Sequence, residues 1–328
     1  MNRIFHASDP VFEAHISSEL ALVEKALLES TRSEYPFVSE TSRHLVVAGG
    51  KRFRPLLVLL AAEFGDPKSP EVIPAAVVVE LTHLATLYHD DVMDEATMRR
   101  GATSANARWD NTVAILTGDF LFARASQILA GLGPDAVRIQ AETFERLCTG
   151  QIKETVGPLD GEDPVKHHLS VLSEKTGSLI ATSGRFGAML SGCDQEVVDT
   201  LTKFGEQIGV AFQLADDIVD ITSMSEQSGK IPGTDLREGI PTLAGLIALT
   251  QAHTENAQLQ ELLSRPLPDP AEHAVALELL RSHSSLNEAR LEACRWADEA
   301  RRTLEPLPEI AAKETLIALC DYVVTRTG

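Results

Sequence analysis

The sequence predicts an all-α protein with one domain spanning residues 1–328. Apolar side chains recur at intervals of three and four residues, which is the periodicity of an amphipathic helix. Convincing strands with two-residue alternation are absent, and no Asn-Gly or Asp-Gly dipeptide joins two apolar runs as in a hairpin. The apolar segments are also long, rich in Ala and free of internal Pro, so helices are expected along most of the chain.

One apolar face marks the first helix, which should begin near Ser8 or Asp9. The residues of this face are Phe12, Ile16, Leu20, Val23 and Leu27. Further helices are expected over residues 74–95, 104–131, 134–156, 164–190 and 195–222. Gly and Pro mark breaks at Gly131–Pro134, Gly157–Pro164, Ser225–Gly239 and Pro266–Pro270. None of these breaks has the composition of a flexible linker, so no domain boundary is expected.

The composition excludes several classes of function. The 328 residues carry 29 Lys and Arg against 48 Asp and Glu, which gives a net charge of −19. This charge repels a phosphate backbone and anionic lipid, so neither nucleic acid nor a lipid surface is an expected partner. A hydrophobic share of 44% and a charged share of 23% are ordinary for a globular protein, and 21 Gly and 16 Pro exclude a collagen-like chain.

The cysteines and the hydropathy pattern predict a cytoplasmic protein. Cys148, Cys193, Cys294 and Cys320 are far apart and form no CxxC pair, which fits a reducing compartment. No stretch approaches the ~18 uninterrupted apolar residues of a membrane helix. The N-terminal residues also lack the apolar region of a signal peptide.

Two aspartate clusters share the pattern DDxxD, within Tyr-His-Asp-Asp-Val-Met-Asp (88–94) and Gln-Leu-Ala-Asp-Asp-Ile-Val-Asp (213–220). On a helix, Asp90 and Asp94 share one face, and so do Asp216 and Asp220. Like charges at this spacing repel each other, and their apolar neighbours make that repulsion costly without a cation. Carboxylates with no His or Cys array suit Mg²⁺, which takes one or two carboxylates plus substrate phosphate oxygens.

Three other interpretations of these acidic residues fit the sequence less well. A solvated acidic face explains one cluster well but two clusters on apolar helices poorly. An EF-hand is a poor fit because both clusters lack the alternating ligands and the Gly of that loop. A di-iron bundle is suggested by Glu80 and His83, which form an ExxH motif, but that architecture needs two such motifs and the sequence has one.

Cationic residues accompany the aspartates. Arg99 and Arg100 follow the first cluster, and the segment Gly-Gly-Lys-Arg-Phe-Arg-Pro places Lys51 and Arg54 three residues apart at an expected helix start. A helix N-terminus with Lys and Arg is a ready anion site. The parts therefore predict a site for two phosphorylated groups, one bound through metal and the other by Lys and Arg. His89 is expected to be structural, and the pair His167-His168 is expected at the surface.

The sequence resembles the trans-isoprenyl diphosphate synthases over nearly its whole length. The segments that carry the resemblance are GGKRFRP, HLATLYHDDVMDEATMRRG, EKTGSLI, FQLADDIVD and GKIPGTDLREGIPTL, in this order. Among members it is most similar to the long-chain polyprenyl diphosphate synthases of menaquinone and ubiquinone synthesis. The resemblance implies a single large bundle of long helices around a central cavity, with the aspartate motifs facing each other across its mouth.

The resemblance also implies a role for each motif residue. The allylic diphosphate would be contacted by Arg99, Lys175, Thr176, Gln213 and Lys230. The diphosphate of isopentenyl diphosphate would be held by Lys51, Arg54, His83 and Arg100. Mg²⁺, three ions with substrate bound, would be held by Asp90, Asp91, Asp94, Asp216, Asp217 and Asp220. The catalytic set would be Asp90, Asp94, Lys175, Asp216 and Lys230.

The implied reaction is ionisation of an allylic diphosphate, attack by isopentenyl diphosphate, and loss of a proton. An apolar cavity with a closing loop would keep water from the cation, and Ser225–Gly239 is the expected loop. A homodimer is usual in the family, and a heteromeric partner subunit remains an alternative. A class I terpene cyclase is a weaker alternative, because it would lack the second DDxxD and the Lys51 and Arg54 site.

The residues upstream of the first motif predict a long product. In the family, bulky side chains four and five residues before the motif form the floor of the product tunnel, and here these positions hold Thr86 and Ala85. Thr82 and Val78 continue this face of the helix, and neither side chain is large. Val78, the farther of the two, lies ~18 Å below Asp90. We therefore expect roughly seven to ten isoprene units. The alternatives are that Ala85 only allows two helices to cross, and that the product is of geranylgeranyl length.

Overall fold

The computed structural model describes residues 9–223, 232–251 and 257–325, and it confirms the all-α prediction. Residue contacts divide the chain into two compact units. Unit 1 comprises Met1–Phe144, Leu179–Gly205 and Pro306–Ala318. Unit 2 comprises Glu145–Ser178, Glu206–Glu305 and Leu319–Gly328.

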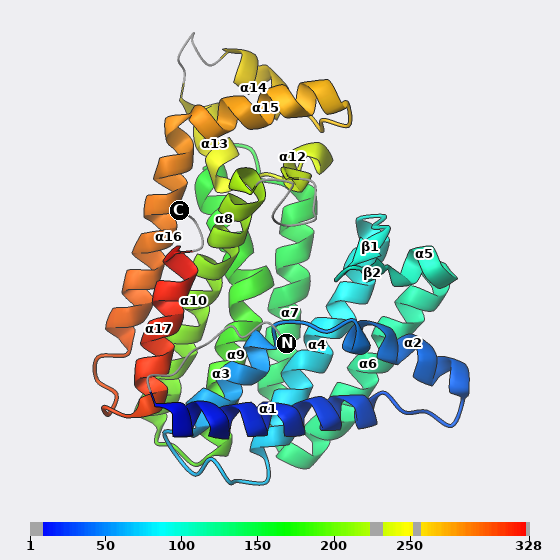
Figure 1. Ribbon diagram of the computed structural model, residues 1–328, viewed down its shortest axis with the longest axis vertical. Coiled ribbons are helices and arrows are strands. Elements are labelled where there is room, and N and C mark those ends of the chain that lie inside the picture. Colours follow the sequence, from blue (N-terminus) through cyan, green and yellow to red (C-terminus); the bar gives the residue numbers. More distant parts are fainter. Residues whose placement is uncertain (1–8, 224–231, 252–256, 326–328) are drawn as a thin grey trace. The chain divides into compact units, whose positions relative to one another are not determined.

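The first half of the chain contributes most of unit 1 (Figure 1). Its elements are α1 (Pro10–Ser30), α2 (Pro36–Val47), α3 (Phe53–Ala62), α4 (Val72–Met93), β1 (Met98–Arg99), β2 (Ala102–Thr103), α5 (Ala105–Trp109), α6 (Asn111–Leu132) and the start of α7 (Pro134–Val156). The remaining elements are α8 (Pro164–Leu172), the π-helical turn η1 (Ser173–Gly177), α9 (Ser178–Leu190), α10 (Gln195–Thr222), α12 (Thr234–Glu238), α13 (Leu243–Thr250), α14 (Ala257–Leu263), α15 (Pro270–Ser282), α16 (Ser284–Thr303) and α17 (Ala311–Thr325).

Helix α4 is the centre of unit 1 and lies along α6, with α3 and α1 also packed against it (Figure 1). Most of its side chains are buried, including the run from Ala75 to Thr82, because α4 is apolar around nearly its whole circumference. Helix α1 confirms the predicted start: the Asp9 carboxylate accepts a hydrogen bond from the Val11 amide at 2.8 Å. The four buried residues of α1, Ile16, Leu20, Val23 and Leu27, all belong to the predicted face.

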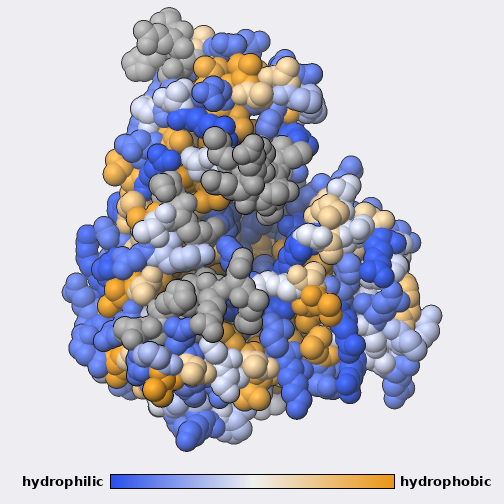
Figure 2. All heavy atoms as spheres, in the orientation of Figure 1, coloured by the Kyte–Doolittle hydropathy of each residue, from blue (hydrophilic) through white to orange (hydrophobic). Residues whose placement is uncertain are grey.

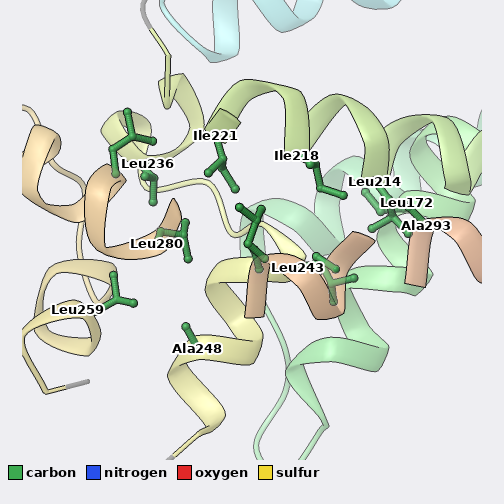
Figure 3. Packing of buried hydrophobic residues seen from close by; sticks show 14 of the residues in the cluster. Leu172, Leu214, Ile218, Ile221, Leu236, Leu243, Ala248, Leu259, Leu280 and Ala293 are labelled. Atoms are coloured by element: carbon green, nitrogen blue, oxygen red, sulfur yellow. The ribbon is translucent and has the colours of Figure 1, made fainter. Parts of the chain in front are cut away.

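Unit 2 has its own hydrophobic core, in which α10 packs with α13, α15 and α16 (Figure 3). Leu214, Ile218 and Ile221 of α10 point into this core (Figure 3), so helical periodicity places Asp216 and Asp220 on the other side of the helix. Because the apolar residues of α10 recur every three or four positions, their burial fixes the direction in which the second aspartate cluster points.

The structure corrects two predicted helices and adds one element. The helix expected over residues 104–131 is broken at Asp110, which has φ = 117° and accepts a hydrogen bond from the Val113 amide at the start of α6. The helix expected over residues 164–190 widens into the π-helical turn η1. Met98–Arg99 and Ala102–Thr103 form a short antiparallel strand pair that was not predicted.

Apolar surface is distributed unevenly among the helices. Two described helices, α4 and α6, are long and apolar enough by length and composition to cross a membrane. Within the most apolar stretch of each helix, 67% is buried in α4 but only 33% in α6. Helix α6 exposes Ile115 and Leu116 as a result. In unit 2, hydrophobic atoms also gather at the surface over α14 and α15, where Val275 is exposed (Figure 2).

Candidate active site

The first aspartate cluster lies at the C-terminal end of α4, and its three carboxylates have different surroundings. Asp90 is half-buried, and Asp94, which caps the helix, is exposed. Asp91 points inward and is fully buried, and its Oδ1 accepts a hydrogen bond from Arg99 Nε at 2.5 Å. Asp90 and Asp94 are therefore the two carboxylates that share the outward face, as their spacing predicted.

The strand pair after α4 positions the two predicted arginines. Arg99 lies in β1, where it pairs with Asp91 and also has Nη2 3.8 Å from Asp94 Oδ2. Arg100 follows with φ = 53° and donates hydrogen bonds to the carbonyl oxygens of Leu45 and Gly49. The turn thus directs the two neighbouring side chains to different sites: Arg99 to the aspartates, and Arg100 to the loop before α3.

A cationic pocket lies around that loop. A cavity of about 680 Å³ is lined by Lys51, Arg52 and Arg100 at its charged side and by Leu28 and Val46 at its apolar side. Helix α3 begins at Phe53, so Lys51 precedes the helix and Arg54 lies in its first turn. Arg52 joins them in a left-handed conformation, with φ = 52°.

Arg52 is a structural member of this pocket that sequence reasoning missed. Its side chain is 1% exposed, and its guanidinium binds the Glu24 carboxylate, Glu80 Oε1 at 2.9 Å and the Val46 carbonyl oxygen. An arginine that binds two carboxylates is held rigidly. The sequence signal was the segment Lys-Arg-Phe-Arg, of which only the two outer cations were assigned a role.

The predicted residues Arg54 and His83 do not line this cavity, but both lie close enough to Arg100 to feel its charge. Burial lowers the pKa of Arg54 to about 10, which leaves it charged at neutral pH. Burial also lowers the pKa of His83, and the positive charges of Arg54 and Arg100 lower it further. His83 is therefore neutral at neutral pH and offers one N–H donor to an anion. The structure thus gathers Arg54, His83 and Arg100 around the loop that carries Lys51.

The second aspartate cluster lies on α10 within unit 2. Asp217 is buried, and its Oδ1 accepts a hydrogen bond from Gln213 Nε2 at 3.0 Å. Gln213 in turn accepts a hydrogen bond from the Thr176 hydroxyl at 3.2 Å, so two of the predicted diphosphate contacts meet here. Burial, together with the charges of Asp235, Asp216 and Asp220, raises the pKa of Asp217 well above its ordinary value.

Asp235 is a further carboxylate at this cluster that the sequence did not reveal. Its backbone amide donates to Asp220 Oδ2 at 3.2 Å. Burial and the charge of Asp220 raise the pKa of Asp235 to about 7. The four carboxylates of Asp216, Asp217, Asp220 and Asp235 repel one another, and a bound cation would relieve this repulsion. The sequence signal for Asp235 is its place in the segment GKIPGTDLREG, in which only Lys230 was predicted to have a role.

The histidine pair was predicted wrongly. His167 and His168 are each 8% exposed, and His167 binds Glu162 Oε2 and the Lys153 carbonyl oxygen, each at 3.1 Å. His168 has Nε2 3.9 Å from Asp217 Oδ2, and burial lowers its pKa to about 4, so it is neutral. The Pro after the loop suggested an exposed helix start, but α8 buries this face.

The π-helical turn positions Lys175 and Thr176. The Lys175 ammonium binds the carboxylate of Glu154, which also accepts a hydrogen bond from Gln151 at 3.1 Å. Gly150 permits this arrangement, because a Cβ at that position would come within 2.7 Å of the Lys175 backbone nitrogen. Glu154 and Gln151 were missed because a Gln and a Glu on a polar helix carry no distinctive signal. Lys230 lies outside the described residues.

The proposed floor positions line the core of unit 1. Val78, Thr82 and Ala85 are fully buried, and Thr86 is half-buried. Thr82 Oγ1 accepts a hydrogen bond from Gln140 Nε2 of α7 at 2.9 Å. The Ala85 carbonyl oxygen lies 3.1 Å from where a Cβ on Gly118 of α6 would be, so α4 and α6 approach closely there. The helix-crossing explanation for Ala85 therefore stays open.

The donor set fits Mg²⁺ that is bound together with substrate. Among the described residues, no three His, Cys, Asp or Glu side chains form a group that could hold a metal ion. Each cluster instead presents one or two outward carboxylates, which is the number that Mg²⁺ takes when phosphate oxygens and waters complete its shell. Burial raises the pKa values of Asp217 and Asp235, and repulsion by neighbouring carboxylates raises them further, which is consistent with a cation bound there.

Comparisons with known proteins agree with this arrangement. The polyprenyl synthetase family model matches residues 35–280. A nonaprenyl diphosphate synthase of Mycobacterium tuberculosis is 48% identical over 98% of this chain and 96% of its own. Component 2 of the heptaprenyl diphosphate synthase of Geobacillus stearothermophilus is 37% identical over 95% of this chain and 97% of its own.

A solved structure supports the fold as well. The geranylgeranyl pyrophosphate synthase of Corynebacterium glutamicum, complexed with calcium and isoprenyl diphosphate, superposes with a TM-score of 0.88 at 47% identity. The match covers 98% of this chain and 99% of that one. The family model and the relatives extend over most of the chain and include both aspartate clusters. The chain therefore belongs to the polyprenyl synthetase family and is a trans-prenyltransferase.

Proposed function

We propose that this protein is a long-chain synthase that adds isopentenyl diphosphate in trans to farnesyl or geranylgeranyl diphosphate. The observation that carries the proposal is the pairing, within unit 1, of an outward carboxylate pair with a separate cationic pocket. The first suits a diphosphate bound through metal, and the second suits a diphosphate bound directly. A reaction between two diphosphate substrates needs both.

Each substrate has its own residues in this proposal. Lys51, Arg54, His83 and Arg100 hold isopentenyl diphosphate. The allylic diphosphate is held by Arg99, Lys175, Thr176, Gln213 and Lys230. Asp90, Asp94 and Asp216, with Asp217 or Asp220, would hold Mg²⁺, which neutralises charge on the departing diphosphate. Because Asp91 is buried against Arg99, we assign it to orienting that arginine.

The product would contain roughly seven to ten isoprene units, because the face of α4 below Asp90 carries only small or aliphatic side chains. A chain of this length suits the side chain of a membrane quinone such as menaquinone. The relatives are named for both long and short products, so the size of the product decides between the two lengths.

We also propose a homodimer in the cytoplasm. Leu116 of α6 is 61% exposed and Val137 of α7 is 44% exposed, so these neighbouring helices present apolar surface that a second copy would cover. The four cysteines all lie in described parts of the chain and form no disulfide there, as in a reducing compartment. Light scattering on the purified protein should give the dimer mass, and Leu116→Glu should give the monomer mass. A wild-type monomer would instead favour a heteromeric enzyme.

The decisive experiment is an incorporation assay with Mg²⁺, labelled isopentenyl diphosphate and farnesyl diphosphate. The products are dephosphorylated and sized by chromatography. A Mg²⁺-dependent series that ends at one long polyprenol supports the proposal. A series that ends near four units keeps the reaction and overturns the chain-length argument. No incorporation by the pure protein would point to a missing partner or to a cyclase, which would release a hydrocarbon.

A further inference from the structure

Glu80 is a buried carboxylate behind the arginines that line the cationic pocket, and the proposed reaction gives it no role. Its side chain is 2% exposed, and its Oε1 lies 2.9 Å from Arg52 Nη1 and 3.9 Å from Arg100 Nη2. Its negative charge also raises the pKa values of Arg54 and Arg100, both of which burial lowers. Glu80 therefore lies among the charges that would bind a diphosphate.

A negative charge at this position opposes the binding of an anion. Charges a few ångströms apart interact strongly when they are shielded from water, so Glu80 repels a diphosphate held by Arg54 and Arg100. Glu80 is not the only carboxylate that binds Arg52, because Glu24, which lines the cavity and has a side chain that is 32% exposed, binds the same guanidinium. The arginines of the pocket thus contact one buried negative charge in addition to a half-exposed one.

The chemistry of repeated addition explains why a lower affinity of the cationic pocket for diphosphate is useful. In each addition the bond between the allylic carbon and its diphosphate breaks, and the double bond of isopentenyl diphosphate forms the new carbon–carbon bond. A proton is then lost, and the released diphosphate carries the electron pair of the broken bond. The lengthened product therefore keeps the diphosphate that came from isopentenyl diphosphate. Before the next addition, this group must leave the cationic pocket.

We propose that Glu80 is a counter-charge that limits the affinity of the cationic pocket for diphosphate, so that the product leaves this pocket after each addition. The proposal rests on the proposed function, because only a synthase that adds several units needs this transfer. It also gives the ExxH motif a role: His83 donates to the diphosphate, and Glu80 weakens its retention. A purely positioning role for Glu80 predicts the opposite, namely weaker binding when the carboxylate is neutralised.

The first test measures binding without turnover. Inorganic diphosphate is titrated calorimetrically into the full chain in EDTA, so that metal-dependent binding at the aspartates is removed. E80Q should bind diphosphate about tenfold more tightly than wild type, since one nearby repulsive charge is gone. The matched control is E24Q, which removes a carboxylate from the same arginine at a more exposed position and should stay within about twofold. Unchanged or weaker binding by E80Q would overturn the proposal.

The second test measures the product series. E80Q should accumulate products of one or two additions, with a lower apparent KM for isopentenyl diphosphate, whereas E24Q should keep the wild-type length. A wild-type length distribution in E80Q would refute the proposal. If wild type itself incorporates no label, the proposed function fails, while the titration still reports on the pocket.

A variant with the charge retained covers the case in which E80Q does not fold, which melting by circular dichroism would show. E80D retracts the carboxylate by one methylene from Arg52 and Arg100. It should bind inorganic diphosphate about two- to threefold more tightly than wild type. Equal or weaker binding by E80D would overturn the proposal in the same way.

Discussion

The two aspartate clusters share a sequence pattern but differ in how the protein compensates their charge. In the first cluster the middle aspartate, Asp91, is fully buried and has an arginine partner supplied by the next element of the chain. In the second cluster the middle aspartate, Asp217, is also buried, but an amide and a neutral histidine lie beside it. One cluster is thus stabilised by the fold, and the other is held under repulsion that a metal would relieve.

The largest effect is expected on turnover, and it should be equal at the two clusters. Asp90→Asn and Asp216→Asn should each lower kcat about 10³-fold, because each removes a proposed metal ligand at the departing diphosphate. The incorporation assay measures this loss. Asp199→Asn, on the same helix as Asp216 but exposed, is the control and should keep wild-type kcat. A loss confined to one cluster would show that the other binds no essential metal.

Neutralising the buried aspartate should change the free energy of unfolding in opposite directions at the two clusters. Without metal at pH 8, Asp91→Asn should destabilise the protein by about 2–4 kcal/mol, because it breaks a buried ion pair with Arg99. Asp217→Asn should stabilise it by about 1–2 kcal/mol, because it removes a repelled charge and keeps an acceptor for Gln213. Urea unfolding of the two variants in EDTA measures both values. Changes of the same sign would remove the distinction between the clusters.

Predicted and observed structure agree where hydrophobic periodicity is strong. They differ where polar contacts determine where a helix breaks or changes its geometry. The boundaries of α7 and α10 follow from their Gly and Pro limits and their apolar faces. The break at Asp110 depends on a side-chain cap, and η1 depends on Gly150, which lies on another helix. Neither leaves a periodic signal, because a helix can pass through such residues when the tertiary contact is absent.

The residues of the candidate active site also divide into those with a sequence signal and those without one. The aspartates could be found because like charges within apolar helices need a partner, and Lys51, Arg54 and Arg100 because cations at a helix start and after the first cluster suggest an anion site. Arg52, Glu154 and Asp235 could not be found in this way. Their roles come from which residues meet in space, and each lies in a polar segment whose composition is ordinary for a surface.

The pH dependence of stability is a further test of the repulsion at the second aspartate cluster. The folded-state pKa of Asp235, about 7, exceeds its ordinary value near 4, so its contribution to stability is fully present below about pH 4 and is lost as the pH rises through 7. Asp235→Asn should therefore gain stability relative to wild type between pH 5 and pH 8, by a few kcal/mol at most. Thermal melts in EDTA at both pH values measure this difference. A difference that does not change with pH would contradict the prediction.

The smallest effect on turnover is expected from the floor positions, where product length changes instead. Ala85→Phe should shorten the product to about three or four units, but at a buried site it should also cost about 1–3 kcal/mol of stability. Thr86→Phe, at a half-buried site, should shorten the product without that cost. Ala141→Phe on the exposed face of α7 is the control. Unchanged length in both floor variants would mean that Ala85 only serves the helix crossing.

The π-helical turn at Ser173–Gly177 has a genetic consequence. A π-helical turn accommodates one residue more than an α-helix would, so the residues on either side are offset by a single position. Loss of one codon within it would let the α-helix run on and would rotate Lys175 and Thr176 relative to Glu154 and Gln213. A single-codon deletion here should therefore abolish activity in a chain that still folds, whereas most single-codon substitutions in α8 or α9 would only weaken it.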